Sequence, residues 1–168
     1  MNCGGEHPTM KVVIHDAGQV SFAVPDDWVE ARDGENTLVL YPRGQPSGTL
    51  RLDVITAQLP SHHSGTLNTA YLRNLLDLQA RSTEGRVELL PNGNVLHKYA
   101  ERRAEGDDLL IHHWEIANAS SARAFRLAIF SFTILAEDEF EQTLKSSIEL
   151  IDVQLRAARF LAISEPST

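Results

Sequence analysis

Apolar residues in this chain mostly alternate with polar ones, and they repeat at helical spacing in only two segments. Alternation over short segments that end at Gly, Pro, Asn or Asp is typical of strands. The sequence therefore predicts an α+β domain in which two helices pack on an antiparallel β-sheet.

The two helices are expected at residues 66–82 and in the segment that follows residue 137. Thr66 is the predicted N-cap of the first helix, and the acidic turn at residues 137–139 suits the N-terminus of the second. Each helix has one apolar face, formed by Leu67, Tyr71, Leu75 and Leu78 in the first and by Phe140, Leu144, Ile148, Ile151 and Leu155 in the second.

The strands are expected in the order β-β-β-β-α-β-β-β-α. Both faces of residues 123–135 are apolar, as expected of a central strand that is covered on both sides. We therefore predict an α/β/α sandwich, although both helices could share one face and leave the other face for a partner. The predicted strands are residues 12–14, 20–24, 37–41, 49–58, 87–90 with 95–101, 109–117 and 123–135.

A hairpin turn is expected at residues 106–107, and it fixes which residues face each other across the last strands. A two-residue turn there would place Tyr99 opposite Trp114 and Glu101 opposite His112. Both pairs are favourable cross-strand contacts. A slip of one residue would turn every side chain of the strand to the other face.

The next turn is expected at residues 119–120, which would bring Phe125 beside Trp114. Tyr99, Trp114 and Phe125 would then form an aromatic cluster on one face of the sheet. At the hairpin end, Arg102 and Arg103 are most simply solvated side chains, although they could contact an acidic partner.

These residues give two alternative candidate sites. The first is a protein-binding surface, because aromatic and arginine side chains dominate such contacts. The second is a small-molecule or enzymatic site that uses His112, Glu101 and Tyr99. The candidate partner-binding residues are Tyr99, Glu101, Arg103, His112 and Trp114.

Charge and composition exclude several classes of protein. A net charge of −8 makes an extended basic face unfavourable, so we expect no nucleic-acid partner. No apolar run approaches the roughly 20 residues of a membrane-spanning helix, so we expect no membrane association. The lone cysteine, Cys3, excludes an internal disulfide and fits a reducing compartment, which predicts a cytoplasmic protein.

Motifs of the common enzyme classes do not occur in the sequence. There is no phosphate-binding loop ending in Gly-Lys-Ser/Thr, no Gly-x-Gly-x-x-Gly and no His-Glu-x-x-His. His62 and His63 are adjacent in a loop, where two imidazoles rarely reach one metal ion, and strand alternation separates His112 from His113. We therefore expect no metal and no cofactor, and this deficit favours binding over catalysis.

The two ends of the sequence are polar and lack periodicity. We predict a disordered leader at residues 1–9, a single domain at residues 10–161 and a disordered tail at residues 162–168. A homodimer is a further possibility, in which an exposed sheet face would be the subunit interface.

Residues 18–28 carry a Phe-x-x-Pro-x-x-Trp pattern, formed by Phe22, Pro25 and Trp28. This segment, followed by a hairpin, a helix, a meander and a long terminal helix, resembles the Mog1/PsbP-like fold and its bacterial DcrB-like (DUF1795) relatives. The resemblance implies a non-enzymatic adaptor, because members include a small-GTPase-binding protein, a photosystem accessory subunit and chaperones of secretion effectors. It favours a cytoplasmic chaperone-like or immunity-like role here.

Overall fold

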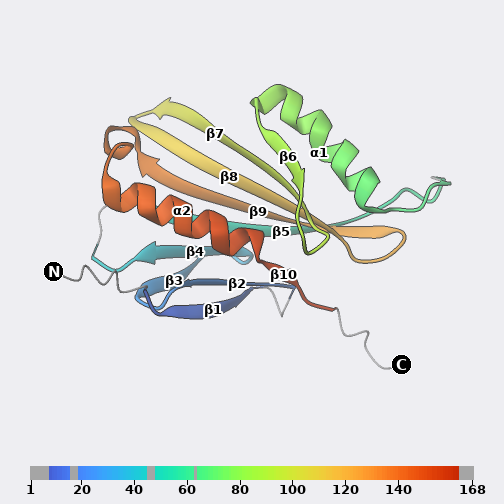
Figure 1. The fold of residues 1–168 in the computed structure, drawn as a ribbon, viewed down its shortest axis with the longest axis horizontal. Coiled ribbons are helices and arrows are strands. Elements are labelled where there is room, and N and C mark those ends of the chain that lie inside the picture. The colour runs from blue at the N-terminus through green and yellow to red at the C-terminus, as the bar shows by residue number, and fades with distance from the viewer. Residues whose placement is uncertain (1–7, 16–18, 45–47, 63, 163–168) are drawn as a thin grey trace.

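The structure is a computed structural model that describes residues 8–15, 19–44, 48–62 and 64–162. Its elements follow the chain in the order shown in Figure 1. They are β1 (Met10–His15), β2 (Val20–Pro25), β3 (Trp28–Asp33), β4 (Thr37–Pro42), β5 (Thr49–Gln58), α1 (Thr69–Thr83), β6 (Arg86–Leu89), β7 (Val95–Glu105), β8 (Asp107–Ala119), β9 (Ala124–Leu135), the short 3-10 helix η1 (Ala136–Asp138), α2 (Gln142–Arg156) and β10 (Arg159–Phe160).

The described strands form two antiparallel sheets, where the sequence predicted one. The larger sheet has seven strands in the order β3-β4-β5-β9-β8-β7-β6, and the smaller has three in the order β1-β2-β10. The predicted central strand is confirmed, since β9 is the middle strand of the larger sheet. The sequence missed β3 and β10, and β6 is a separate strand from β7.

The two helices pack on opposite faces of the larger sheet, which confirms the predicted α/β/α arrangement. On one face, α2 and the small sheet enclose the main core, in which Leu144 and Phe22 pack with Trp114 and Phe130. On the other face, Leu72 and Leu76 of α1 pack with the second cluster, which includes Val95 and Ala117. We call the first face the closed face.

Helix α1 covers only part of the second face. Its main contacts are with β6, β7 and β8, and Figure 1 places it over that end of the sheet. The remaining outward side chains of β3, β4, β5, β9 and the outer parts of β8 and β7 lie beyond the helix. We call this uncovered part the open face.

The predicted register of β7 and β8 is wrong by one residue. Gly106 alone turns the chain, with a φ of 88° that residues other than glycine rarely adopt, and Tyr99 therefore lies opposite His113. The β8–β9 turn is also longer than expected, because Ala119 pairs with Phe125 and Trp114 pairs with Phe130. The predicted cluster of Tyr99, Trp114 and Phe125 does not form.

Both helices start later than expected. The N-cap of α1 is Asn68, whose Oδ1 accepts a hydrogen bond from the Tyr71 backbone N–H at 2.9 Å. The acidic residues before α2 form η1 instead of its first turn, and α2 begins at Gln142. Phe140 precedes the helix and is 78% exposed, so its predicted place on the buried face is wrong.

No helix in the described part of the chain has the length and apolar character needed to cross a membrane. The predicted leader and tail lie almost wholly outside the described residues. Thr9, at the end of the predicted leader, accepts a backbone hydrogen bond from Asp26 at 2.9 Å. The ranges 1–9, 10–161 and 162–168 stay predictions.

Candidate functional site

The five candidate residues do not form one site. Tyr99, Glu101 and Arg103 point to the open face, because β7 residues of odd number share the face of Val95, against which α1 packs. His112 and Trp114 point to the closed face, where Trp114 is fully buried. The predicted group of His112, Glu101 and Tyr99 is therefore wrong, since the sheet separates His112 from the other two.

A ladder of stacked rings runs across β7 and β8 on the open face. Tyr99 lies between two histidines, with its ring centroid 4.8 Å from that of His97 and 4.4 Å from that of His113. His97 is fully buried near the C-terminal end of α1, and its Nε2 lies 3.0 Å from the Thr83 hydroxyl. Tyr99 and His113 are half-buried, so the ladder leads from beneath α1 to the uncovered sheet.

Two carboxylates hold this ladder in place. Glu115 lies 2.8 Å from His97 Nδ1 and accepts a hydrogen bond from the Tyr99 hydroxyl at 3.4 Å. Glu101 lies 3.1 Å from His113 Nε2 and pairs with Arg103 at 2.7 Å. The sequence predicted that Glu101 would pair with His112, and the register makes His113 its partner instead.

The ladder is a set of hydrogen-bond donors and acceptors, with no strong base at its centre. Burial raises the pKa of Tyr99 to about 12, and the negative charges of Glu115 and Glu101 add to that effect. The phenol therefore keeps its proton near neutral pH. This arrangement suits recognition of a polar group better than proton abstraction.

The open face continues from the ladder across β9, β5 and β4. The register places His113 beside Ser131 of β9, and Ser131 beside Arg51 of β5. Side chains along this surface are partly exposed, and the apolar ones include Tyr41, which is 38% exposed, and Ile55, which is 49% exposed. This surface was not predicted from the sequence. The available signal was Ile55, an apolar residue on the face of its strand that does not carry the buried residues.

On the closed face, one carboxylate ties α2 to the sheet. Asp152 accepts hydrogen bonds from Lys98 Nζ, Trp114 Nε1 and Arg156 Nε, each at 2.7 Å. Burial alone would raise the pKa of Asp152, but these three hydrogen bonds together hold that pKa below its ordinary value. Trp114, predicted as a partner-binding residue, is therefore a structural residue that anchors α2.

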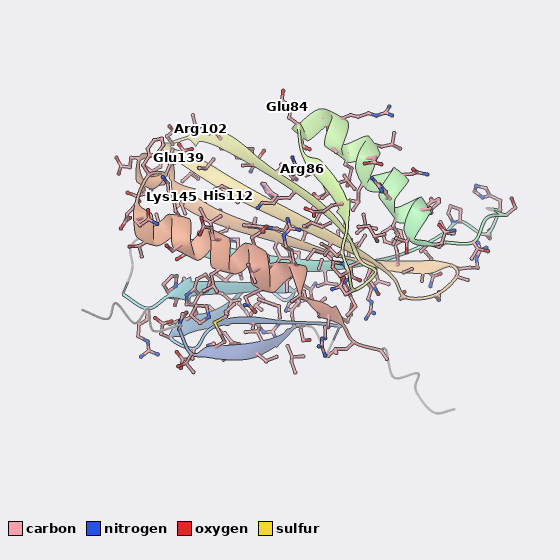
Figure 2. The ribbon with its side chains drawn as sticks, viewed as in Figure 1. Glu84, Arg86, Arg102, His112, Glu139 and Lys145 are labelled. Atoms are coloured by element: carbon pink, nitrogen blue, oxygen red, sulfur yellow. The ribbon has the colours of Figure 1, made fainter. Side chains whose placement is uncertain are left out.

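A cleft of about 370 Å³ opens beside this anchor, between β6, β7 and the C-terminal end of α2. Figure 2 shows His112 beside α2. Arg102 and Glu139 lie to one side of His112, and Arg86 and Glu84 lie to the other. His112 Nε2 is buried and has no hydrogen-bond partner among the described residues. Burial, followed by the nearby charge of Lys98, lowers the pKa of His112.

The cleft has mixed charge, because its lining includes Arg86, Lys98 and Arg156 together with Glu84 and Glu88. Within the described ranges, no three His, Cys, Asp or Glu side chains are placed to hold a metal ion. The loop residue His62 is exposed, and His63 lies outside the described residues.

Comparison with known proteins identifies the fold but no family. No family model matches the chain, and no curated protein sequence matches it significantly. A Bacteroides thetaiotaomicron crystal structure superposes with a TM-score of 0.61 and 14% identity, over 94% of this chain and 50% of that one. The chain thus spans about half the length of the Bacteroides protein.

The Saccharomyces cerevisiae Ran-binding protein Mog1p superposes with a TM-score of 0.54 and 13% identity. The match covers 93% of this chain and 97% of Mog1p, so the superposition extends over nearly the whole length of both proteins. The chain therefore has the Mog1/PsbP-like fold that the segment around Phe22, Pro25 and Trp28 predicts.

Proposed function

We propose that this chain is a protein-binding module and that a partner protein covers its open face. The observation that carries the proposal is the exposure of Tyr41 and Ile55 on the uncovered sheet. Apolar side chains that share one surface with polar groups are typical of recognition sites. The open face combines both, because the ladder around Tyr99 lies on the same face as these apolar residues and continues toward them across Ser131 of β9 and Arg51 of β5.

The size of the open face fits a partner protein. Strands lie about 4.8 Å apart and present one outward side chain every second residue, which gives the open face on the order of 600 Å². A stable protein contact buries about 800 Å² on each partner, so the open face would supply most of such a contact and its rim the rest. A small ligand would instead need a deep and mostly enclosed pocket.

The chemistry of its edge also suits a protein partner. Arg103 stands at the end of the open face near the β7–β8 turn, and Tyr99 lies on the same face four residues earlier in β7; tyrosine and arginine dominate the energetics of protein contacts. Arg103 is exposed, and only Glu101 is its ion-pair partner among the described residues. An acidic side chain of the partner could therefore bind at this edge.

The fold adds support of a more general kind, since Mog1p, which shares it, is named as a Ran-binding protein. A finer proposal follows from the resemblance to the DcrB-like relatives: a chaperone-type or immunity-type adaptor that acts in the cytoplasm. The lone Cys3 supports the reducing compartment that this version requires.

The test is affinity capture from native lysate with matched surface variants. The doubly substituted chain Tyr41→Lys with Ile55→Lys should lose the captured partner, because two charges would be buried against it. Val12→Lys is the control, since Val12 is also an exposed strand residue but lies on the small sheet. A partner that binds both variants equally, or a metabolite turned over without any stable partner, contradicts the proposal.

A further inference from the structure

The larger sheet has two edges, and they differ in how accessible they are. At one edge, Lys11 of β1 donates a hydrogen bond to the Trp28 carbonyl of β3 at 2.6 Å and pairs with Glu30 at 3.1 Å. The small sheet therefore occupies part of that edge. At the other edge, β6 pairs with β7 on one side and with no described strand on the other.

Strand β6 carries its charges in a self-complementary order. Val87 points toward α1, while Arg86 and Glu88 point to the opposite face. Glu88 binds Arg156 at 2.8 Å, but Arg86 is exposed and has no ion pair among the described residues. An unpaired cation and a carboxylate thus stand two residues apart on the same side of an open edge.

We propose that β6 pairs antiparallel with β6 of a second copy of this chain, about a two-fold axis through Val87. A two-fold axis perpendicular to the sheet keeps each face on its own side, so each residue pairs with a residue of the same face. Centring on Val87 sets Arg86 opposite Glu88 of the second copy, and the symmetry repeats that pair. Both unpaired guanidinium groups gain a partner.

The neighbouring registers are unfavourable, so the charges specify one pairing. Centring on Arg86 would set two arginines opposite each other, and centring on Glu88 would do the same with two glutamates. Like charges directly opposite one another destabilise a strand pair. The charge order on β6 therefore selects the register as well as the partner.

An apolar groove at the end of β6 adds contact area to this edge. It has a volume of about 790 Å³ and is lined by Leu89, Leu90, Pro91, Val153 and Ala157, together with polar neighbours. Leu89 is 54% exposed, and Val153 is also exposed. Pairing through β6 would join two seven-stranded sheets, satisfy backbone groups that an open edge strand leaves unpaired, and remove part of this groove from water.

Charge reversal of the full-length chain tests the proposal, with mass measured by sedimentation over a range of concentrations. The wild-type chain should reach twice its monomer mass. Arg86→Glu should give two like-charged pairs and raise the dimer dissociation constant about tenfold, and Glu88→Arg should do the same. An equimolar mixture of the two variants should form a heterodimer, because each then carries the charge that the other lacks.

Two controls separate this interface from the alternatives. Arg32→Glu changes an exposed arginine on the opposite edge strand β3 and should leave the dimer intact. Val12→Lys changes the exposed edge strand β1 and should also leave it intact. A wild-type chain that stays monomeric, a dimer that Arg86→Glu leaves unchanged, a Val12→Lys variant that dissociates, or a mixture that forms no heterodimer would each overturn the proposal.

Discussion

The closed and open faces of the larger sheet are made by the same strands, yet their side chains have different environments. On the closed face of β9, Phe130 and Phe132 are fully buried under α2 and the small sheet. On the open face of the same strand, Ile129 and Ser131 are only half-buried. Alternation along one strand thus separates residues that hold the fold from residues that can meet a partner.

Because of this difference, substitutions on the closed face should change the stability of the fold, and substitutions on the open face should change recognition of a partner. Side chains of the main core under the closed face are buried against one another, so a change among them alters the packing of their neighbours. The open face borders water, so a change there alters few buried contacts. Substitution of matched residues on the two faces tests this division.

The largest difference is expected between adjacent residues of β9. Phe130→Ala should lower the free energy of unfolding by about 3–5 kcal/mol, because it leaves a cavity in a well-packed core. The ring packs edge-to-face on Phe22, with centroids 5.1 Å apart. Ile129→Ala should cost about 1 kcal/mol, since its site is already open to water. Urea denaturation measures both, and equal losses would contradict the division between the faces.

The anchor of α2 should have the next largest effect. Asp152→Asn should cost about 2–3 kcal/mol at neutral pH, because the amide has no charge to pair with Lys98 and its nitrogen cannot accept the hydrogen bond that Asp152 Oδ2 accepts from Arg156. Asp77→Asn, at an exposed pair 3.9 Å from Arg73, is the control and should cost much less.

The same variant has a defined dependence on pH. The pKa of Asp152 is held below its ordinary value of 3.8 in the folded chain, so its stabilisation is complete above that value and is lost as the pH falls through the folded pKa. Urea denaturation of wild type and Asp152→Asn should therefore converge in acid. A gap that stays constant down to the lowest pH would show that the charge of Asp152 is not what anchors α2.

A smaller effect is expected for His112, the polar residue of the closed face whose Nε2 lacks a described partner. His112→Leu should raise the free energy of unfolding at pH 7 by up to about 1 kcal/mol, because an unpaired buried nitrogen is removed. Burial lowers the pKa of His112, so below about pH 6.5 the unfolded chain binds a proton that the folded chain excludes.

Wild type should consequently lose more stability than His112→Leu between pH 7.5 and pH 5.5. Thermal unfolding at the two pH values measures this difference. His62→Leu is the matched control for the removal of a histidine, because His62 lies exposed in a loop. If wild type and His112→Leu lost the same stability between the two pH values, His112 would not be the source of the dependence on pH.

Elements whose evidence is local could be predicted from the sequence. The alternation at residues 49–58 gave β5 with its observed bounds, and the two apolar faces of β9 placed it at the centre of the sheet. Strand β3 was missed because its alternation is short, with only Val29 and Ala31 as apolar residues after Trp28, and it is a strand mainly through its pairing with β4. Such pairing is a non-local property.

The register was the hardest feature to predict, and it decided the candidate site. A turn of one glycine in place of two residues moved His113 into the place expected for His112, so only Tyr99, Glu101 and Arg103 stayed together. The apolar pattern did contain the correct answer. The observed register sets Leu96 opposite Ile116, two large apolar residues of the main core, whereas the expected one would have set Leu96 opposite the small Ala117, which packs on the other face.

The smallest effect is expected at Ser131, in the middle of the open face. Ser131→Val should change the free energy of unfolding by no more than about 0.5 kcal/mol, because a half-buried β-branched residue suits a strand whose face borders water. It should nevertheless weaken capture of a partner if that partner bonds to the hydroxyl between His113 and Arg51. A loss of several kcal/mol in urea denaturation would mean that the open face is packed as tightly as the closed one, and the division between stability and recognition would fail at the strand where it is clearest.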